Sequence, residues 1–280
     1  MRHLLGIILI AGSYGSVRAQ VSGPINTGNV SGSSLFKDFS SLVIHSAILG
    51  DSLDIIVKTP LGYDQSQLNY PLLLALDADG SFGMATDIPT LLLFEGGAKR
   101  VVVAGISYRS FDKWLARRER DLTPTRDPQK PESGGASLFL ESIHREIIPA
   151  IESKFRVGQS DRILYGHSYG GLFGLFVLFK SSDLFSTYIL TSPSVDWHSE
   201  STLAIEDTFS KENKELASTV FISVGGKEDD IKRPLSNLVN QIKSRNYKSL
   251  NLHFEEIPGE THMGSMASAY TKALRWIFSQ

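Results

Sequence analysis

Short apolar runs alternate with helical patterns along most of this chain, and that alternation restricts the folds it can adopt. Seven runs rich in β-branched or aliphatic residues occur at residues 53–59, 71–76, 100–106, 162–166, 187–192, 219–224 and 250–256. Several are apolar nearly throughout, as strands are when helices cover both faces of their sheet. The alternation therefore predicts an α/β fold with a mainly parallel central sheet and helices on both faces.

The helical patterns lie between these runs. Phe139, Ile143, Ile147 and Ile151 recur every four residues and predict a helix with one apolar stripe, which Pro149 should kink or end early. Further helices are expected at residues 169–180, 231–245 and 266–279. Residues 123–135, which are rich in proline and glycine, predict a long loop of the kind that often carries a function.

The N-terminus has the three parts of a secretory signal. A basic start precedes an apolar run at residues 4–11, and Val17-Arg18-Ala19 offers a small-x-small cleavage site. We expect a signal peptide at residues 1–19 with cleavage after Ala19, a flexible leader at 20–40 and one folded domain at 41–280. The apolar run is too short to span a bilayer, so the expected location is periplasmic or secreted.

Composition excludes several classes of protein. The 280 residues contain no cysteine, which excludes a disulfide scaffold, a thiolate-bound metal and a thiol nucleophile. The formal net charge of -2 lacks the basic excess of a dedicated nucleic-acid binder. We therefore expect no nucleic-acid partner and no membrane span, while the oligomeric state cannot be read from the sequence.

The strongest motif is Gly166-His167-Ser168-Tyr169-Gly170, which follows an apolar run and precedes a predicted helix. This is G-x-S-x-G in the strand–turn–helix setting of a nucleophile elbow. The small residues allow strand and helix to approach closely, so the hydroxyl of Ser168 is lifted above the sheet. The backbone N–H of Tyr169 is then available to a developing oxyanion.

A serine nucleophile needs a base, and the chain has seven histidines. His262 lies between the last predicted strand and the last predicted helix, which is the position of the base when the triad runs Ser, acid, His along the chain. The third member should follow a strand between the two. The run at 219–224 leads into Gly225-Gly226-Lys227-Glu228-Asp229-Asp230, and spacing alone does not choose among its three carboxylates.

Further stretches accompany these motifs: residues 53–64 (LDIIVKTPLGYD), 70–80, 120–124 (RDLTP), 166–171 (GHSYGG), 192–194 (SPS) and 259–262 (GETH). Together they resemble the esterase family of the α/β-hydrolases. This family includes enterobactin (siderophore) esterases, esterase D-type thioesterases and feruloyl esterases, and more distantly mycolyltransferases. The segment RDLTP closely matches the R-D-x-T-P segment of the siderophore-esterase group. The resemblance runs from about residue 46 to the C-terminus and implies an α/β-hydrolase fold.

The resemblance also bears on site residues. In the siderophore-esterase group the acid commonly appears as G-x-x-E, which favours Glu228 over Asp229. The family's D-G oxyanion loop corresponds to residues 77–80, where Ala78 and Asp79 are extra, so we expect the second oxyanion donor near Ser81. No metal and no cofactor are implied.

Three residues are candidates for substrate binding near the predicted site: Arg109, Phe82 and Trp197. The basic run Arg109, Lys113, Arg117, Arg118 and Arg120 is by default a solvated helix face, but the resemblance puts it beside the site. We expect Arg109 to engage an anionic substrate group. Phe82 and Trp197 are expected as apolar walls for an acyl or aromatic group, although such residues more often belong to the core.

The sequence therefore predicts an exported serine carboxylic-ester hydrolase, of about 261 residues after signal cleavage and without a large separate cap domain. It would act through Ser168, His262 and Glu228, or Asp229 as the alternative acid, and an acyl-enzyme. The substrate is a small-molecule ester, with a siderophore or another acyl or aromatic ester as candidates. The alternatives are an acyltransferase with the same triad and a non-catalytic binding module on a hydrolase scaffold.

Overall fold

The central sheet has eight strands, and a computed structural model describes it within residues 38–198 and 201–279. The spatial order is β1 (Phe39–Ser46), β2 (Asp51–Lys58), β4 (Val102–Ser107), β3 (Tyr70–Ala75), β5 (Val157–His167), β6 (Thr187–Thr191), β7 (Thr219–Gly225) and β8 (Asn251–Ile257). The pairs β1–β2 and β2–β4 are antiparallel, and every other neighbouring pair is parallel.

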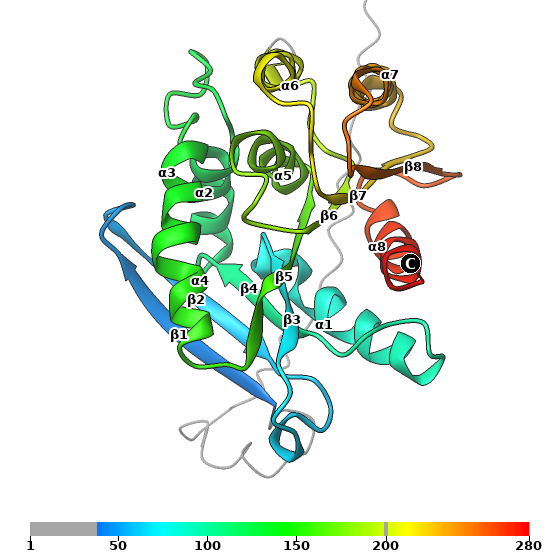
Figure 1. The fold of residues 1–280 in the computed structure, drawn as a ribbon. Helices are drawn as coiled ribbons and strands as arrows, with labels where there is room; N and C mark the ends of the chain where they lie inside the picture. The colour runs from blue at the N-terminus through cyan, green and yellow to red at the C-terminus, as the bar shows by residue number, and fades with distance from the viewer. Residues whose placement is uncertain (1–37, 199–200, 280) are drawn as a thin grey trace, which may run out of the picture. The chain divides into compact units, whose positions relative to one another are not determined.

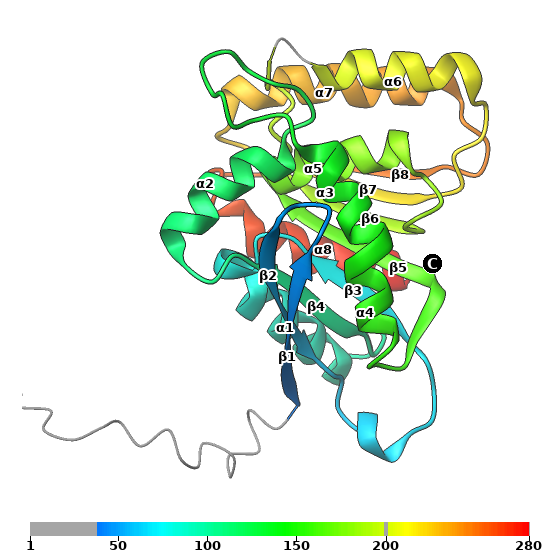
Figure 2. The ribbon, with the colours of Figure 1, turned by 90° about the vertical axis from the view of Figure 1, so that its left-hand side faces the viewer.

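Helices cover both faces of this sheet (Figure 1, Figure 2). One face carries α1 (Ala78–Phe94) and α8 (Ser265–Phe278). The other carries α2 (Phe111–Leu122), α3 (Ala136–Ser142), α4 (Ile148–Glu152), α5 (Tyr169–Lys180), α6 (Ser201–Glu212) and α7 (Asp229–Arg245). The predicted α/β-hydrolase architecture is confirmed. Residues 38–280 form one unit, so the described chain has no separate cap domain.

Helix α5 packs between the sheet and the other helices on the same face. Its residues from Gly170 to Phe179 are all buried, because the sheet lies beneath it and other helices pack around it. A helix that is apolar all round must be enclosed in this way. The result is a rigid central element directly behind Ser168.

The helix predicted around Pro149 neither ends nor breaks there. A π-helical turn, η3 (Ile143–Ile147), joins α3 to α4, and the Ile148 N–H donates to the Ile143 carbonyl. In a regular α-helix the ring of Pro149 would clash with the carbonyl four residues earlier, and the wider turn just before it relieves that clash.

The predicted leader boundary is two residues too late. Phe39 and Ser40 already pair with Lys58 and Val57 in β1, an edge strand whose polar-rich alternation conceals it in the sequence. The predicted signal peptide and the rest of the leader lie outside the described residues. Among the helices that the structure does describe, none combines the length and apolarity needed to cross a membrane.

Close packing at Gly166 generates a prediction. A Cβ at this position would lie 2.2 Å from the Gly170 carbonyl oxygen and 2.4 Å from its carbon, both backbone atoms. We expect Gly166→Ala to lower the free energy of unfolding by about 2–4 kcal/mol, measured by urea denaturation. Gly83→Ala is the matched control, since a Cβ on Gly83 meets nothing within 4 Å, and helix propensity should raise stability by about 0.5–1 kcal/mol. Equal stability of Gly166→Ala and wild type would contradict the predicted clash.

Candidate active site

Ser168 occupies a sharp turn between β5 and α5. Its backbone has φ 59° and ψ −119°, a conformation that L residues rarely adopt. The turn is held because the Ser168 N–H donates to the Thr191 carbonyl at 3.1 Å and the Leu172 N–H donates to the Ser168 carbonyl at 2.9 Å. The side chain is thereby projected beyond the carboxyl end of the sheet, as expected for a nucleophile elbow.

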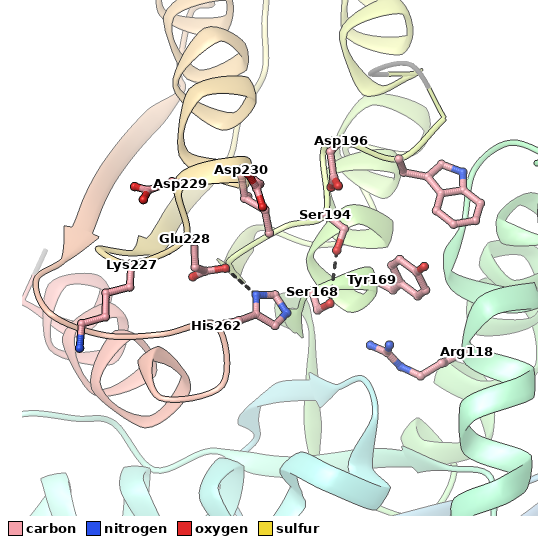
Figure 3. Close-up of a pocket in the computed structure, with 12 residues that line it drawn as sticks. Arg118, Ser168, Tyr169, Ser194, Asp196, Lys227, Glu228, Asp229, Asp230 and His262 are labelled. Carbon is pink, nitrogen blue, oxygen red and sulfur yellow. Dashed lines mark hydrogen bonds and ion pairs between the residues drawn. The ribbon is translucent and has the colours of Figure 1, made fainter. Parts of the chain in front are cut away.

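His262 lies in the loop between β8 and α8, as the sequence predicts. Its Nδ1 lies 2.5 Å from Glu228 Oε2. The imidazole ring lies between Glu228 and Ser168 (Figure 3). The hydroxyl of Ser168 is itself 3.3 Å from that of Ser194, and proton transfer to His262 requires it to rotate toward the imidazole.

The three candidate acids are separated by their environments. Glu228 is buried, whereas Asp229 and Asp230 are exposed. Glu228 Oε1 accepts from Ser192 Oγ and from the Gly225 N–H, each at 2.6 Å. Asp229 instead pairs with Lys232 on the surface of α7. Only Glu228 of the three contacts His262 among the described residues.

The prediction for Ser81 is wrong. Ala78 and Asp79, the residues extra to the family pattern, do not form a loop but begin α1 directly after Asp77. The Ser81 N–H therefore donates to the Asp77 carbonyl at 3.1 Å, and its hydroxyl is 2.9 Å from the Leu76 carbonyl. Ser81 serves the first turn of the helix and cannot also hold an oxyanion.

A pocket of about 600 Å³ opens above Ser168. Its lining comes from α2, α5, the segment after β6, the start of α7 and the His262 loop: Arg118, Ser168, Tyr169, Ser194, Asp196, Trp197, Lys227, Glu228, Asp229, Asp230, Ile231 and His262. Trp197 thus lies where the sequence predicts. In the described part of the chain, no three or more His, Cys, Asp and Glu side chains gather as metal ligands would.

Two other predicted binding residues lie outside this lining. Arg109 donates to Asp54 at 2.7 Å on the surface. Phe82 packs against Gly105, on the sheet face covered by α1 and α8. Arg109 lies in the turn before α2, and of the basic run only Arg118, on α2 itself, lines the pocket.

Arg118 is the basic residue of this run at the pocket. Its guanidinium makes two 3.0 Å bonds to the carboxylate of Asp77, which also accepts from Trp114 Nε1 at 2.6 Å. The same guanidinium lies 5.0 Å from the ring centre of Tyr169. Arg118 thus braces the turn after β3 and the residue after the nucleophile. The i, i+4 spacing of Trp114 and Arg118 is the signal in the sequence that could have identified them.

The loop at residues 123–135 also reaches the site. Lys130 Nζ donates to the hydroxyl of Tyr169 at 2.9 Å and lies 5.1 Å from the ring centre of Trp197. Trp197 Nε1 donates to the Thr125 carbonyl at 3.2 Å. The loop therefore fixes the aromatic wall of the pocket from behind.

His167 supports the site from the sheet side. Its ring centre lies 4.5 Å from that of His262, and its Nδ1 is 3.0 Å from Thr191 Oγ1. Burial, with the neighbouring His262 and Arg118, lowers the pKa of His167 to about 3. The His167 ring is therefore neutral at neutral pH.

This lowered pKa predicts how stability depends on pH. In the unfolded chain a histidine takes up its proton near pH 6.5, so between pH 6.5 and about 3 the unfolded state gains a proton that folded His167 does not. As the pH is lowered through this range, the free energy of unfolding should decrease by about 1.4 kcal/mol per pH unit because of His167 alone.

When the pH is lowered from 6.5 to 4.5, we expect the free energy of unfolding of His167→Gln to decrease by about 2–3 kcal/mol less than that of wild type. Urea denaturation at both pH values measures this difference. An equal loss in the two proteins would contradict a neutral buried His167.

Comparison with known proteins identifies the family of this chain. The Esterase family, described as "Putative esterase", matches residues 46–269. The chain is 30% identical over 227 residues to ferri-bacillibactin esterase BesA of Bacillus subtilis, covering 74% of this chain and 78% of that protein. It is 29% identical over 220 residues to the siderophore triacetylfusarinine C esterase of Aspergillus fumigatus, covering 74% of each chain.

Solved structures give the same result for the fold. An IroE-like serine hydrolase from Shewanella oneidensis superposes with a TM-score of 0.78 at 24% identity, covering 86% of this chain and 80% of that one. The BES protein from Bacillus cereus gives a TM-score of 0.76 at 26% identity, covering 86% and 94%. The chain belongs to the Esterase family of the α/β-hydrolases and is a carboxylic-ester hydrolase.

Proposed function

We propose that this protein is a serine ester hydrolase that cleaves siderophore esters through Ser168, His262 and Glu228. The observation that carries the proposal is the arrangement beside one pocket (Figure 3). Ser168 is strained, the His262 imidazole lies between it and Glu228, and the buried Glu228 carboxylate is 2.5 Å from His262 Nδ1. The siderophore substrate class is supported by the names of the relatives, two of which are esterases of ferri-bacillibactin and triacetylfusarinine C.

The first half-reaction forms an acyl-enzyme. Ser168 Oγ attacks the ester carbonyl carbon while His262 Nε2 takes the hydroxyl proton. Glu228 holds the ring by its Nδ1–H and stabilises the imidazolium. When the tetrahedral intermediate collapses, the C–O bond to the alcohol breaks and His262 returns its proton to the leaving oxygen.

The second half-reaction releases the acid. Water attacks the acyl carbon while His262 accepts a proton from it, the bond to Ser168 Oγ breaks, and the serine recovers a proton from His262. The carboxylic acid leaves, and the enzyme is returned to its starting state.

The oxyanion is held by two backbone N–H groups in this proposal. Tyr169 supplies the first, from the start of α5. We assign the second to the backbone N–H of Asp77 and not to that of Ser81. β3 and β5 are parallel neighbours with Ala75 opposite Tyr165, so the chain leaves β3 at Asp77 beside the Ser168 turn. The bonds of the Asp77 carboxylate to Arg118 and Trp114 would hold this turn in place.

Export is part of the proposal, on the basis of the signal-like residues 1–19. A mature enzyme without cysteine would depend on its packed sheet and helices, not on disulfides, in an oxidising compartment.

Wild type and Ser168→Ala should be compared on p-nitrophenyl butyrate, triacetylfusarinine C and ferri-bacillibactin, with products identified by mass spectrometry. We expect wild type to release free acid from at least one siderophore ester, and Ser168→Ala to lose activity at least about 10³-fold with an unchanged circular dichroism spectrum. Turnover unaffected by Ser168→Ala would overturn the mechanism. Turnover of the simple ester alone would remove the siderophore substrate class.

A further inference from the structure

The carboxylate of Glu228 needs an anchor outside its own turn. Glu228 stands just before α7, and its bond from the Gly225 N–H comes from three residues earlier in the same turn. That bond moves with the turn and cannot fix the carboxylate relative to the rest of the site. The other bond to Oε1 comes from Ser192, which follows β6 and is 36 residues away in sequence.

Ser192 lies where it can link the nucleophile to the acid. His167 and Thr191 are partners in the β5–β6 register, so Ser168 and Ser192 follow side by side on neighbouring strands. The Ser192 N–H donates to the Ser223 carbonyl at 2.8 Å, on the strand that leads to Glu228. The Ser192 hydroxyl therefore connects the strand beside the nucleophile to the triad acid.

The backbone of Ser192 has φ 44°, in the left-handed region that favours glycine. Glycine would adopt this conformation without strain, so the presence of a strained serine indicates that its side chain has a role. Ser192 is fully buried, and its hydroxyl also lies 3.3 Å from that of Ser265, which in turn is 3.0 Å from the His262 carbonyl. The Glu228 side chain is only 4% exposed, so little solvent is available to replace this bond.

From these contacts we infer that Ser192 is a positioning residue of the triad, which holds the ionised Glu228 carboxylate with Oε2 directed at His262 Nδ1. A donated hydrogen bond stabilises the charge of a carboxylate, so loss of the Ser192 hydroxyl should affect the pH dependence of catalysis as well as kcat. The inference rests on the proposed serine esterase function.

The test uses Ser192→Gly and Ser192→Ala with p-nitrophenyl butyrate. Both variants remove the hydroxyl, and Ser192→Gly also relieves the backbone strain at this position. Ser192→Gly therefore serves as the test variant if Ser192→Ala does not fold. We expect kcat to fall about 10- to 100-fold in Ser192→Gly with KM changed less than about twofold. The acidic limb of the kcat/KM profile should move to higher pH, because the negatively charged pair has lost a donor.

Ser223→Ala is the matched control. Ser223 is a fully buried serine on the neighbouring strand, and its hydroxyl has no hydrogen-bond partner among the described residues. We expect its kcat and its acidic limb to equal those of wild type. The titratable and charged groups around the pair stay intact in all these variants. They are His167 on β5, Arg118 on α2, Asp196 after β6, Lys227 just before α7, Asp229 and Asp230 in its first turn, and Glu260 in the His262 loop.

Thermal denaturation of each variant completes the experiment. A folded Ser192→Gly with wild-type kcat and an unmoved acidic limb would overturn the positioning role. If wild type hydrolyses neither this ester nor the siderophore esters, or if Ser168→Ala retains activity, the proposed function itself fails. An active wild type, an inactive Ser168→Ala and a fully active Ser192→Gly would reject the positioning role alone.

Discussion

The site depends on the close approach of β5 and α5 at the Ser168 turn. Gly166 leaves no space for a Cβ against Gly170, and this contact allows Ser168 to hold its positive φ while the next residue begins a helix. Helix α5 is enclosed on all sides, so the packing of the core maintains the strain at the turn.

Parallel neighbours then bring the other participants to the same edge. Ser192 follows β6, Glu228 follows β7 and His262 follows β8, each at the carboxyl end of its strand. Residues that lie up to 94 positions apart in sequence can therefore meet in one pocket, the usual location of sites in open α/β sheets. Buried hydrogen bonds between these strand ends fix the acid more firmly than the turn before α7 could alone.

Local patterns in the sequence were sufficient for the fold and for the positions of Ser168 and His262, because a strand, a tight turn and a helix each have a short-range signal. The choice among the three candidate acids required three-dimensional information. Glu228, Asp229 and Asp230 are adjacent, and only the direction in which each side chain leaves the turn distinguishes the buried carboxylate from the exposed ones. The predictions for Ser81 and Arg109 were wrong for a related reason. Packing decides whether residues 78–81 form a loop or a helix, and which arginine between residues 109 and 120 faces the pocket.

Covalent labelling tests the central claim most directly. Treatment with a fluorophosphonate, followed by peptide mapping with mass spectrometry, should place one adduct on Ser168, since a serine activated by a neighbouring imidazole attacks phosphorus as it attacks a carbonyl. The same adduct should form far more slowly in His262→Ala. An adduct on another residue, or labelling of Ser168 at the same rate without His262, would contradict the account.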